Sequence, residues 1–383
     1  MSRQASITSL LLMLLATWCT GCGGSVSASE SGSYTIGLIT SQTGSASQLG
    51  AGELKGAQLA VDTVNAAGGV GGHRLELRAS DDQSNPSQTV LATRRMLSWA
   101  DAVVGPSVAG ACNAAAPLTT SARIIDYCLS PGIRPAAGST TWSASASTEA
   151  LAERLVGYWQ RRGITRIGLL HTTDASGIDG ARALRSAVAG AEGMRLTGVA
   201  DYDPGAISVT SQIQIATGGR PQALVVWASG AAAGVAFKGL KEAGNTLPVA
   251  TTDANLTFTF MQRIASYTPR TLLVPATRDF WGDQVNGDAA DRVRDYQAAY
   301  RKRFRETPDF GPGVAYDAVL LVARALQQAE GNPRQAVREL ERLADFHGVL
   351  GTYTFGPNDH RGLTVDDVAV VRATRGGFTY AGR

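Results

Sequence analysis

The short apolar run Ala102–Val104 ends abruptly at Gly105-Pro106, and small residues follow it, including Ser107. If a helix begins in the next segment, Val108, Ala109 and Gly110, its first backbone N–H groups have no partner within the helix. Free N–H groups at a helix N-terminus bind carboxylates, and small side chains let a ligand approach them. Close packing of a helix on a strand would require the same small residues, so this segment alone leaves both interpretations open.

A second loop favours the ligand interpretation. Ser130, Pro131 and Gly132 follow the next apolar run and again place a hydroxyl group and a glycine where a strand ends. Loops at the carboxyl ends of parallel strands are the usual position of a ligand in open α/β sheets. The two loops together therefore predict a binding site for a small acidic group.

Catalytic patterns are weak in this sequence. There is no phosphate-binding glycine loop and no nucleophile elbow, and the histidines lack the spacing of metal ligands (His73, His171, His347 and His360). Asp81 and Asp82 are expected to cap the following helix through Asx and N-cap hydrogen bonds, because Pro86 stands near its first turn. We therefore expect a protein that is not an enzyme and has neither a cofactor nor a metal ion.

Composition is that of an ordinary globular protein. The chain has 383 residues, of which 44% are hydrophobic and 17% charged, and its formal net charge is +3. This length allows two domains. The basic residues are scattered among acids rather than clustered, so we expect no nucleic-acid partner.

The N-terminus has the layout of an export signal, with one basic residue, Arg3, and an apolar run from Leu10 to Ala16. Thr20-Gly21-Cys22 resembles the bacterial lipobox, although Cys19 stands where that motif usually has leucine. We predict a signal peptide at 1–21 and a lipidated tether at 22–32, so the protein would be exported and anchored to the membrane through Cys22, facing the periplasm or the cell exterior. Ordinary signal cleavage near Ala28 is the alternative.

Two further cysteines, Cys112 and Cys128, remain after processing. A pair of cysteines in an exported protein is a disulfide candidate, because the compartment is oxidising. Two buried free thiols are the alternative.

Strand-like and helix-like segments alternate along the chain, which predicts an α/β fold with largely parallel sheets. One α/β unit extends through the strand Ile124–Leu129, and the pattern restarts with a helix marked by Leu151, Leu155 and Trp159, which begins a second unit of similar size. The predicted strands are Tyr34–Thr40, Leu75–Leu77, Ala102–Val104, Ile124–Leu129, Arg166–His171, Leu196–Tyr202, Ala223–Trp227, Pro248–Thr251, Leu272–Val274, Thr352–Phe355 and Asp367–Val371, and two long helices are predicted at about Asp288–Phe304 and Val314–Ala329.

Several segments carry a family resemblance by their order and spacing: 34–86, VVGPSVAGACNAAAP, SPG, AYDAV and FHGVLGTYTF. The chain resembles the branched-chain amino-acid binding proteins of ABC importers, which have the type I periplasmic binding fold. The resemblance implies two doubly wound, mostly parallel-sheet lobes joined by three crossovers. Lobe I would comprise 33–146 and 277–349, and lobe II 147–276 and 350–383. It also implies a monomer that closes by a hinge on its ligand.

Transfer of the family's site to this chain reveals departures. The second hydroxyl residue that binds a ligand carboxylate in the family is replaced by Ala109, and the loop with Asp174 and Ser176 lacks the family's covering tyrosine. Asp253 matches the acid that pairs with an amino group. The expected ligand-binding residues are Thr43, Ser107, Val108, Ala109, Gly110, Ser130, Pro131, Gly132, Arg134, Asp174, Ser176, Trp227, Ser229, Asp253 and Trp281.

The resemblance implies an extracytoplasmic solute-binding protein that delivers a small amino acid to an ABC permease. An aliphatic or branched-chain amino acid, or a related carboxylate, is the expected ligand. The alternative is a ligand-sensing receptor of the same fold for an aromatic acid or an amide, which signals rather than transports.

Overall fold

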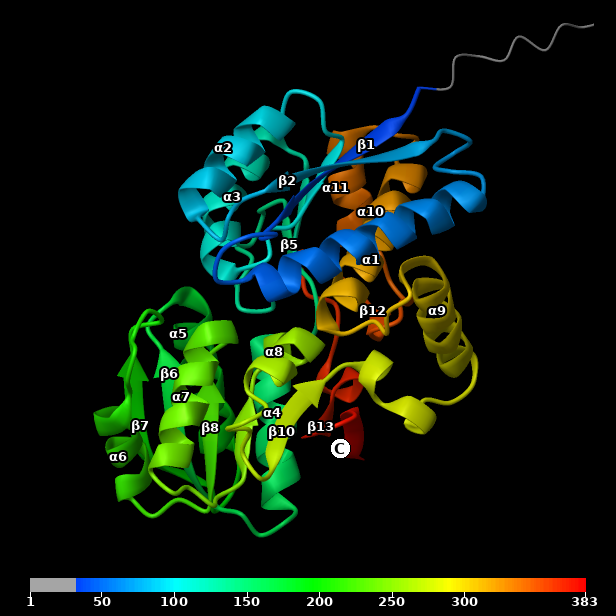
Figure 1. The fold of residues 1–383 in the computed structure, drawn as a ribbon. Helices are drawn as coiled ribbons and strands as arrows, with labels where there is room; N and C mark the ends of the chain where they lie inside the picture. Colours follow the sequence, from blue (N-terminus) through cyan, green and yellow to red (C-terminus); the bar gives the residue numbers. More distant parts are fainter. Residues whose placement is uncertain (1–31) are drawn as a thin grey trace, which may run out of the picture. The chain divides into compact units, whose positions relative to one another are not determined.

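The computed structural model describes residues 32–383. The predicted signal peptide and Cys22 lie outside the described residues, so lipidation stays a prediction. Within the described residues, two β-sheets carry most of the architecture (Figure 1).

The first sheet is parallel and has the strand order β2-β1-β3-β4-β5. Its strands are β1 (Tyr34–Thr40), β2 (Leu75–Asp81), β3 (Ala102–Val104), β4 (Ile125–Cys128) and β5 (Thr141–Ser143). Successive side chains of a strand point to opposite faces. Ile36 and Leu38 accordingly belong to one hydrophobic cluster and Ile39 to another, so both faces of β1 are buried.

Helices cover both faces of this sheet. The helices α1 (Ser47–Ala66), α10 (Phe310–Gln328) and α11 (Pro333–Glu341) pack together on one face, and α2 (Pro86–Met96) and α3 (Ala109–Ala122) on the other (Figure 1). The helix α9 (Asp288–Phe304) packs beside α1.

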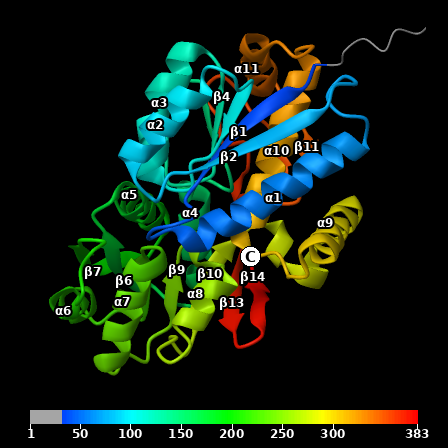
Figure 2. The ribbon, with the colours of Figure 1, turned by 45° about the horizontal axis from the view of Figure 1, so that its top comes forward.

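The second sheet has the order β14-β13-β10-β9-β8-β6-β7, and its pairings are parallel except for the two that β13 makes with β10 and β14. Its strands are β6 (Arg166–Thr172), β7 (Arg195–Tyr202), β8 (Ala223–Trp227), β9 (Val249–Thr251), β10 (Leu272–Ala276), β13 (Ala369–Thr374) and β14 (Gly377–Gly382). Its helices are α4 (Thr148–Gln160), α5 (Ala175–Gly190), α6 (Thr210–Gly218), α7 (Gly230–Glu242) and α8 (Phe258–Arg263). The helices α4 and α5 lie on one face, and α6, α7 and α8 on the other (Figure 2).

The chain passes between the two sheets three times. It leaves the first sheet after β5, returns after β10 to form α9 to α11, and leaves again after the short strands β11 (Phe346–His347) and β12 (Thr352–Tyr353). Asp317 of α10 fixes the last passage, because its carboxylate accepts the N–H groups of Val349 and Leu350 and the hydroxyl of Tyr353. The predicted α/β fold is therefore confirmed, whereas the lobe boundaries stay a prediction.

Several elements differ from the expectation. The strands β5 and β14 and the helix α11 were not predicted, since β5 and β14 have few β-branched residues and α11 is short. Thr352–Tyr353 pairs only with β11, so this strand is shorter than expected and joins neither large sheet.

The start of α2 is a partial correction. Asp81 and Asp82 form the expected Asx hydrogen bonds with the N–H groups of Gln83 and Ser84. The N-cap residue, however, is Asn85, whose side chain accepts the Ser87 N–H at 2.8 Å. Asn85 has the extended backbone that an N-cap requires, and Pro86 follows at the first helical position.

Candidate functional site

A cavity of about 250 Å³ lies where the loops at the carboxyl ends of the two sheets meet. Its lining is made of small and hydroxyl-bearing residues together with backbone: Ser45, Ala46, Gln48, Leu49, Ser84, Ser107, Val108, Ala109, Gly110, Leu129, Ser130, Pro131, Asp174, Ala175, Ser176, Pro204, Ser229, Gly230, Ala231, Ala232, Thr252, Ala254 and Phe310. Asp174 is the one ionisable side chain in this set. A cavity of this size suits a small solute rather than a drug-sized molecule.

The N-terminus of α3 forms one wall. Gly105 permits the sharp turn before it, with φ +97°, and a Cβ atom there would lie 1.8 Å from the Ile39 carbonyl oxygen. The Val108 carbonyl accepts the N–H groups of Ala111 and Cys112. Within residues 32–383, the N–H groups of Ala109 and Gly110 have no hydrogen-bond acceptor, so they and the positive end of the helix dipole are free for an anion.

A disulfide bond braces this wall. Cys112 in the first turn of α3 is bonded to Cys128 at the end of β4, with 5.8 Å between their Cα atoms. The predicted pairing is confirmed. Because Cys128 directly precedes the loop with Ser130, the bond connects the two loops that the sequence assigned to the carboxylate.

Ser107 lines the cavity, but its hydroxyl group is also bonded to the protein interior. Its Oγ accepts the Ser41 N–H at 2.9 Å and is hydrogen-bonded to Oε2 of Glu53, a fully buried residue of α1. Burial raises the pKa of Glu53 to about 8, the hydrogen bond from Ser107 opposes this rise, and the nearby Asp82 adds to it. Glu53 was not among the residues expected at the site.

The Ser130–Pro131–Gly132 loop forms the adjacent wall. The Ser130 Oγ accepts the Gly132 N–H at 3.3 Å, and the Ser130 carbonyl accepts the Ser143 hydroxyl at 2.8 Å. Gly132 itself does not line the cavity. A Cβ atom at this position would lie 3.1 Å from the Ser176 Oγ, so Gly132 allows the loop to approach α5 closely.

Residues of the second sheet's loops close the opposite side. Asp174 caps α5 by accepting the Gly177 N–H at 2.8 Å, and Ser176 follows in the first turn. Ser229 precedes Gly230, which has φ +58° and donates its N–H to Asn255 Oδ1. A Cβ atom on Gly230 would lie 3.4 Å from the Gln48 Nε2, so α7 and α1 approach each other here.

Asp253 lies directly behind this wall. Its carboxylate accepts the Thr252 hydroxyl at 2.9 Å, the Ala254 N–H at 3.0 Å and the Ser145 hydroxyl at 3.1 Å. It is 1% exposed, and burial raises its pKa to about 6 against the lowering effect of these hydrogen bonds. Thr252 and Ala254 line the cavity, whereas Asp253 does not, so a ligand meets this charge only through Thr252.

Four of the expected ligand-binding residues lie away from this cavity. Thr43 donates its hydroxyl to Asp81 at the exposed surface, and Arg134 forms ion pairs with Glu149 and Asp179. Trp227 is buried against Gly180 of α5, because the side chain at the end of β8 points to the α4–α5 face. Trp281 is buried against Val285 and Ala369.

Comparison with known proteins identifies the family to which this fold belongs. The family model described as periplasmic binding protein matches residues 33–377. The chain belongs to this periplasmic binding protein family. Among curated proteins, the Leu/Ile/Val-binding protein BraC3 of Rhizobium johnstonii is 39% identical over 77 residues, 20% of this chain and 21% of that protein. The Leu/Ile/Val-binding protein homolog 3 of Brucella melitensis is 38% identical over 63 residues, 16% of this chain and 17% of that protein. The matched segment thus spans about a fifth of these relatives.

Solved structures share the fold over nearly the whole length. An extracellular ligand-binding receptor from Rhodopseudomonas palustris has a TM-score of 0.82 at 19% identity, and the match covers 91% of this chain and 99% of that one. A branched-chain amino acid transporter substrate-binding protein from Streptococcus pneumoniae, in complex with isoleucine, has a TM-score of 0.75 at 22% identity and covers 92% of this chain and 100% of that one. At this identity the likeness shows the type I periplasmic binding fold.

Several lining residues of this periplasmic binding protein were missed by the sequence analysis. Gln48 and Ser84 follow β1 and β2, and Phe310 begins α10. The Oε1 atom of Gln48 is buried without a hydrogen-bond partner among the described residues. The segments after β1, β2 and β3 all begin at the carboxyl edge of the same parallel sheet. This shared edge could have identified Gln48 and Ser84 as neighbours of the loop with Ser107.

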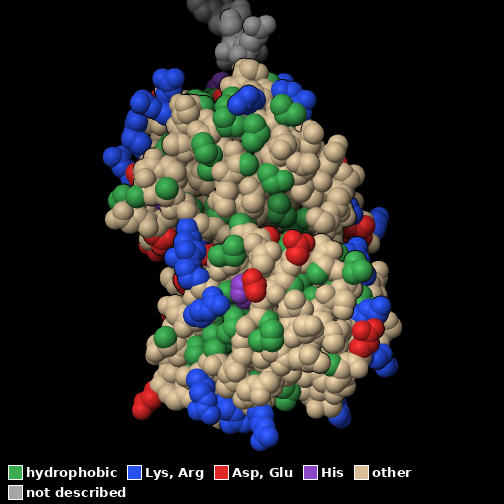
Figure 3. Space-filling view, turned by 90° about the vertical axis from the view of Figure 1, so that its left-hand side faces the viewer, with side chains coloured by type: hydrophobic (Ala, Val, Ile, Leu, Met, Phe, Trp, Pro, Cys, Tyr) green, Lys and Arg blue, Asp and Glu red, His purple; other side chains and the backbone are tan. Residues whose placement is uncertain are grey.

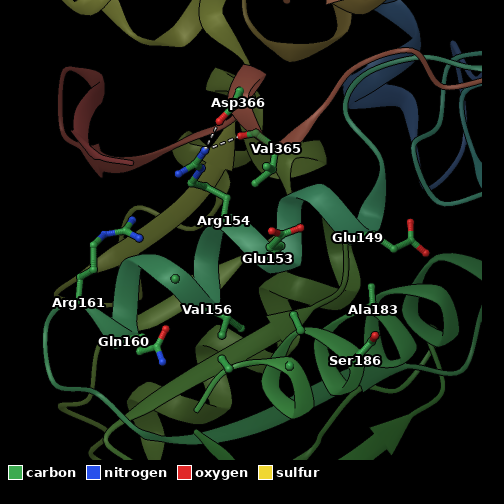
Figure 4. A pocket seen from close by; sticks show the side chains of 14 residues that line it. Glu149, Glu153, Arg154, Val156, Gln160, Arg161, Ala183, Ser186, Val365 and Asp366 are labelled. Carbon is green, nitrogen blue, oxygen red and sulfur yellow. Dashed lines mark hydrogen bonds and ion pairs between the residues drawn. The ribbon is translucent and has the colours of Figure 1, made fainter. Parts of the chain in front are cut away.

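A second, larger hollow of about 540 Å³ lies between α4 and α5 (Figure 4). Arg154 is directed toward Asp366 and the carbonyl group of Val365 there, and the other walls include Val156, Ala183 and Ser186. Its lining shares no residue with the cavity at the carboxyl ends of the strands, so it is not the candidate ligand site.

Residues 32–383 contain neither a membrane-spanning helix nor a metal-ligand cluster. No helix in this range is both long and apolar enough to cross a bilayer, and no group of three His, Cys, Asp or Glu side chains there could hold a metal ion. On the face shown in Figure 3, Lys and Arg side chains occur in separate groups with Asp and Glu between them.

Proposed function

We propose that this periplasmic binding protein is the solute-binding component of an ABC importer and binds a small amino acid, an aliphatic one before others, or a related carboxylate. The observation that carries the proposal is the pairing of two features across one small cavity. Free N–H groups of Ala109 and Gly110 lie on one wall, and Thr252 with the buried Asp253 behind it lies on the other.

The ligand carboxylate would bind the α3 wall. Backbone N–H groups of Ala109 and Gly110 would donate to it, and the hydroxyl groups of Ser107 and Ser130 lie beside them on the cavity wall. Backbone donors are unaffected by the replacement of the family's second hydroxyl residue by Ala109. Hydrogen bonds to a charged acceptor are about twice as strong as neutral ones.

The ligand ammonium group would bind the Thr252 hydroxyl, whose proton is committed to Asp253 at 2.9 Å. Thr252 therefore presents lone pairs to the cavity, and the Asp253 carboxylate lies one hydrogen bond further back. This arrangement keeps the role predicted for Asp253 but makes it act through Thr252. Asp174 is exposed at the rim, where water screens its charge.

The side chain of the ligand would occupy the space next to Leu49, Leu129 and Phe310. These residues supply apolar surface, and Phe310 is the one aromatic ring among the lining residues. An aliphatic side chain fits this wall better than an aromatic ring that requires stacking partners.

A thermal-shift screen with aliphatic amino acids, aromatic acids and amides tests the proposed ligand class. A ligand at about 100 times its Kd adds about 2.7 kcal/mol to the stability of the protein. We expect L-isoleucine or L-leucine to give the largest rise in Tm. If aromatic acids or amides alone raise Tm, the sensing receptor becomes the better assignment.

A further inference from the structure

Glu53 is a buried carboxyl group next to the proposed carboxylate site. It lies in α1 with no exposed surface, and its Oε2 is bonded to Ser107 Oγ, which lines the cavity. Its Oε1 is buried and has no hydrogen-bond partner among the described residues. Such a group is expensive to ionise, since neither a cation nor additional donors compensate the charge.

No charged group of opposite sign is bonded to Glu53 within residues 32–383. Asp82, which follows β2, is also a carboxylic acid, and its side chain accepts hydrogen bonds from the Ser41 and Thr89 hydroxyl groups. Asp309, before α10, lies against the neighbouring Gly52. Lys55, half-buried two positions further along α1, pairs with Glu306 at 2.6 Å. The surroundings of Glu53 therefore favour its neutral form, consistent with a pKa near 8.

The protonation state of Glu53 determines what Ser107 can offer a ligand. A hydroxyl group has one hydrogen to donate and two lone pairs. The Ser41 N–H uses one lone pair of Ser107. An ionised Glu53 can only accept, so Ser107 must donate its hydrogen inward and presents a lone pair to the cavity. A protonated Glu53 can donate to the second lone pair, which leaves the Ser107 hydrogen free to point into the cavity.

We propose that Glu53 is a positioning residue that retains its proton and thereby makes the Ser107 hydroxyl a hydrogen-bond donor to the ligand carboxylate. This inference rests on the proposed function, since it requires a carboxylate at the α3 wall. Binding of a carboxylate then requires the proton on Glu53. Loss of that proton removes one donor and places a second negative charge beside the ligand.

The pH dependence of L-isoleucine binding tests this coupling by isothermal titration calorimetry between pH 6.5 and 9. With a pKa of about 8, Kd for the wild type should weaken about tenfold at pH 9 relative to E53Q. In Glu53→Gln the amide can donate to Ser107 at every pH, so its affinity at pH 7 should stay within about threefold of wild type. The ligand's own amino group titrates equally in both experiments and cancels in the comparison.

Three further measurements test whether the pH dependence arises from Glu53 and acts through Ser107. Ser107→Ala should weaken L-isoleucine about 10- to 100-fold at pH 7, as expected for loss of a donor to a charged group. Glu306→Gln removes an exposed carboxylate of the same lobe and should leave the pH profile unchanged. The side-chain ¹³C shift of Glu53, assigned by its absence in E53Q, should titrate with a midpoint near 8 in the ligand-free protein.

A ¹³C midpoint below about 5.5 overturns the inference, whatever binds, because the carboxyl group would then be ionised at neutral pH. Parallel pH profiles for wild type and E53Q also overturn it, and they leave the proposed function intact. If neither L-isoleucine nor phenylacetate binds, the proposed function fails and the inference fails with it.

Discussion

Asp253→Asn is the substitution that tests how the proposed site recognises an ammonium group. The change removes a negative charge but keeps a side-chain oxygen that can accept the Thr252 hydroxyl. The ammonium group would lie two hydrogen bonds from the carboxylate, roughly 5 Å away. At an effective dielectric constant of about 20, two unit charges at this distance attract by about 3 kcal/mol.

The expected loss of affinity follows from this attraction. Because the carboxylate is not in direct contact with the ligand, we expect about 2–3 kcal/mol, which corresponds to roughly 30- to 150-fold in Kd. The Tm of the ligand-free protein should change little. Asn relieves the burial penalty that raises the pKa of Asp253 to about 6, while it loses part of the bonding to Ser145 and Ala254.

Calorimetry with L-isoleucine and with its deaminated analogue 3-methylpentanoate separates the charge effect from general damage. Asp253→Asn should weaken L-isoleucine only, and Thr252→Val should do the same. Asp174→Asn is the matched control, since Asn also caps a helix and Asp174 is exposed at the rim. A large loss for Asp174→Asn together with an unchanged Asp253→Asn would refute the reasoning.

Three further outcomes are expected. Cys112→Ser with Cys128→Ser removes a loop closure of 16 residues and should lower the free energy of unfolding by about 3 kcal/mol in denaturant titrations; an unchanged midpoint contradicts this. Burial raises the pKa of Asp126 to about 8. The folded protein therefore retains a proton there that the unfolded chain loses, and the free energy of unfolding falls progressively as pH rises from about 4 to 8. Asp126→Asn should therefore raise Tm at pH 8 and change it little at pH 4, and the reverse pattern would disprove the burial argument. Cys22→Ser in the full-length chain should release the protein from the membrane fraction; equal partitioning of both forms argues against lipidation.

The fold could be predicted from the sequence largely because the strands are strongly apolar and their loops carry clear turn residues. Tyr34–Thr40, Ala102–Val104 and Ala223–Trp227 have the predicted bounds. The strand Gly377–Gly382 could not be found this way. It contains three aromatic or β-branched residues among glycines, and antiparallel pairing with β13 stabilises it in the folded protein.

The predicted site residues coincide with the cavity lining where backbone forms the wall and differ from it where side-chain direction decides the position. The α3 wall and the Ser130 loop follow from glycine, proline and small residues next to strands. Trp227 shows the limit, because the sequence places it at a strand end but does not tell which face of the sheet its ring enters. Glu53 was missed since it lies in the middle of a helix, 54 positions from Ser107.

Gly110→Phe tests the central claim most directly, with Gly190→Phe as its matched control. Gly110 lines the cavity, and a Cβ atom there has no atom within 4 Å, so the phenyl ring can enter the cavity without a clash at its base. Gly190 has equally open surroundings but lines the hollow between α4 and α5. By calorimetry, Gly110→Phe should abolish binding of L-isoleucine with an unchanged Tm, while Gly190→Phe binds as wild type. Wild-type affinity in Gly110→Phe would contradict the assignment of this cavity as the ligand site.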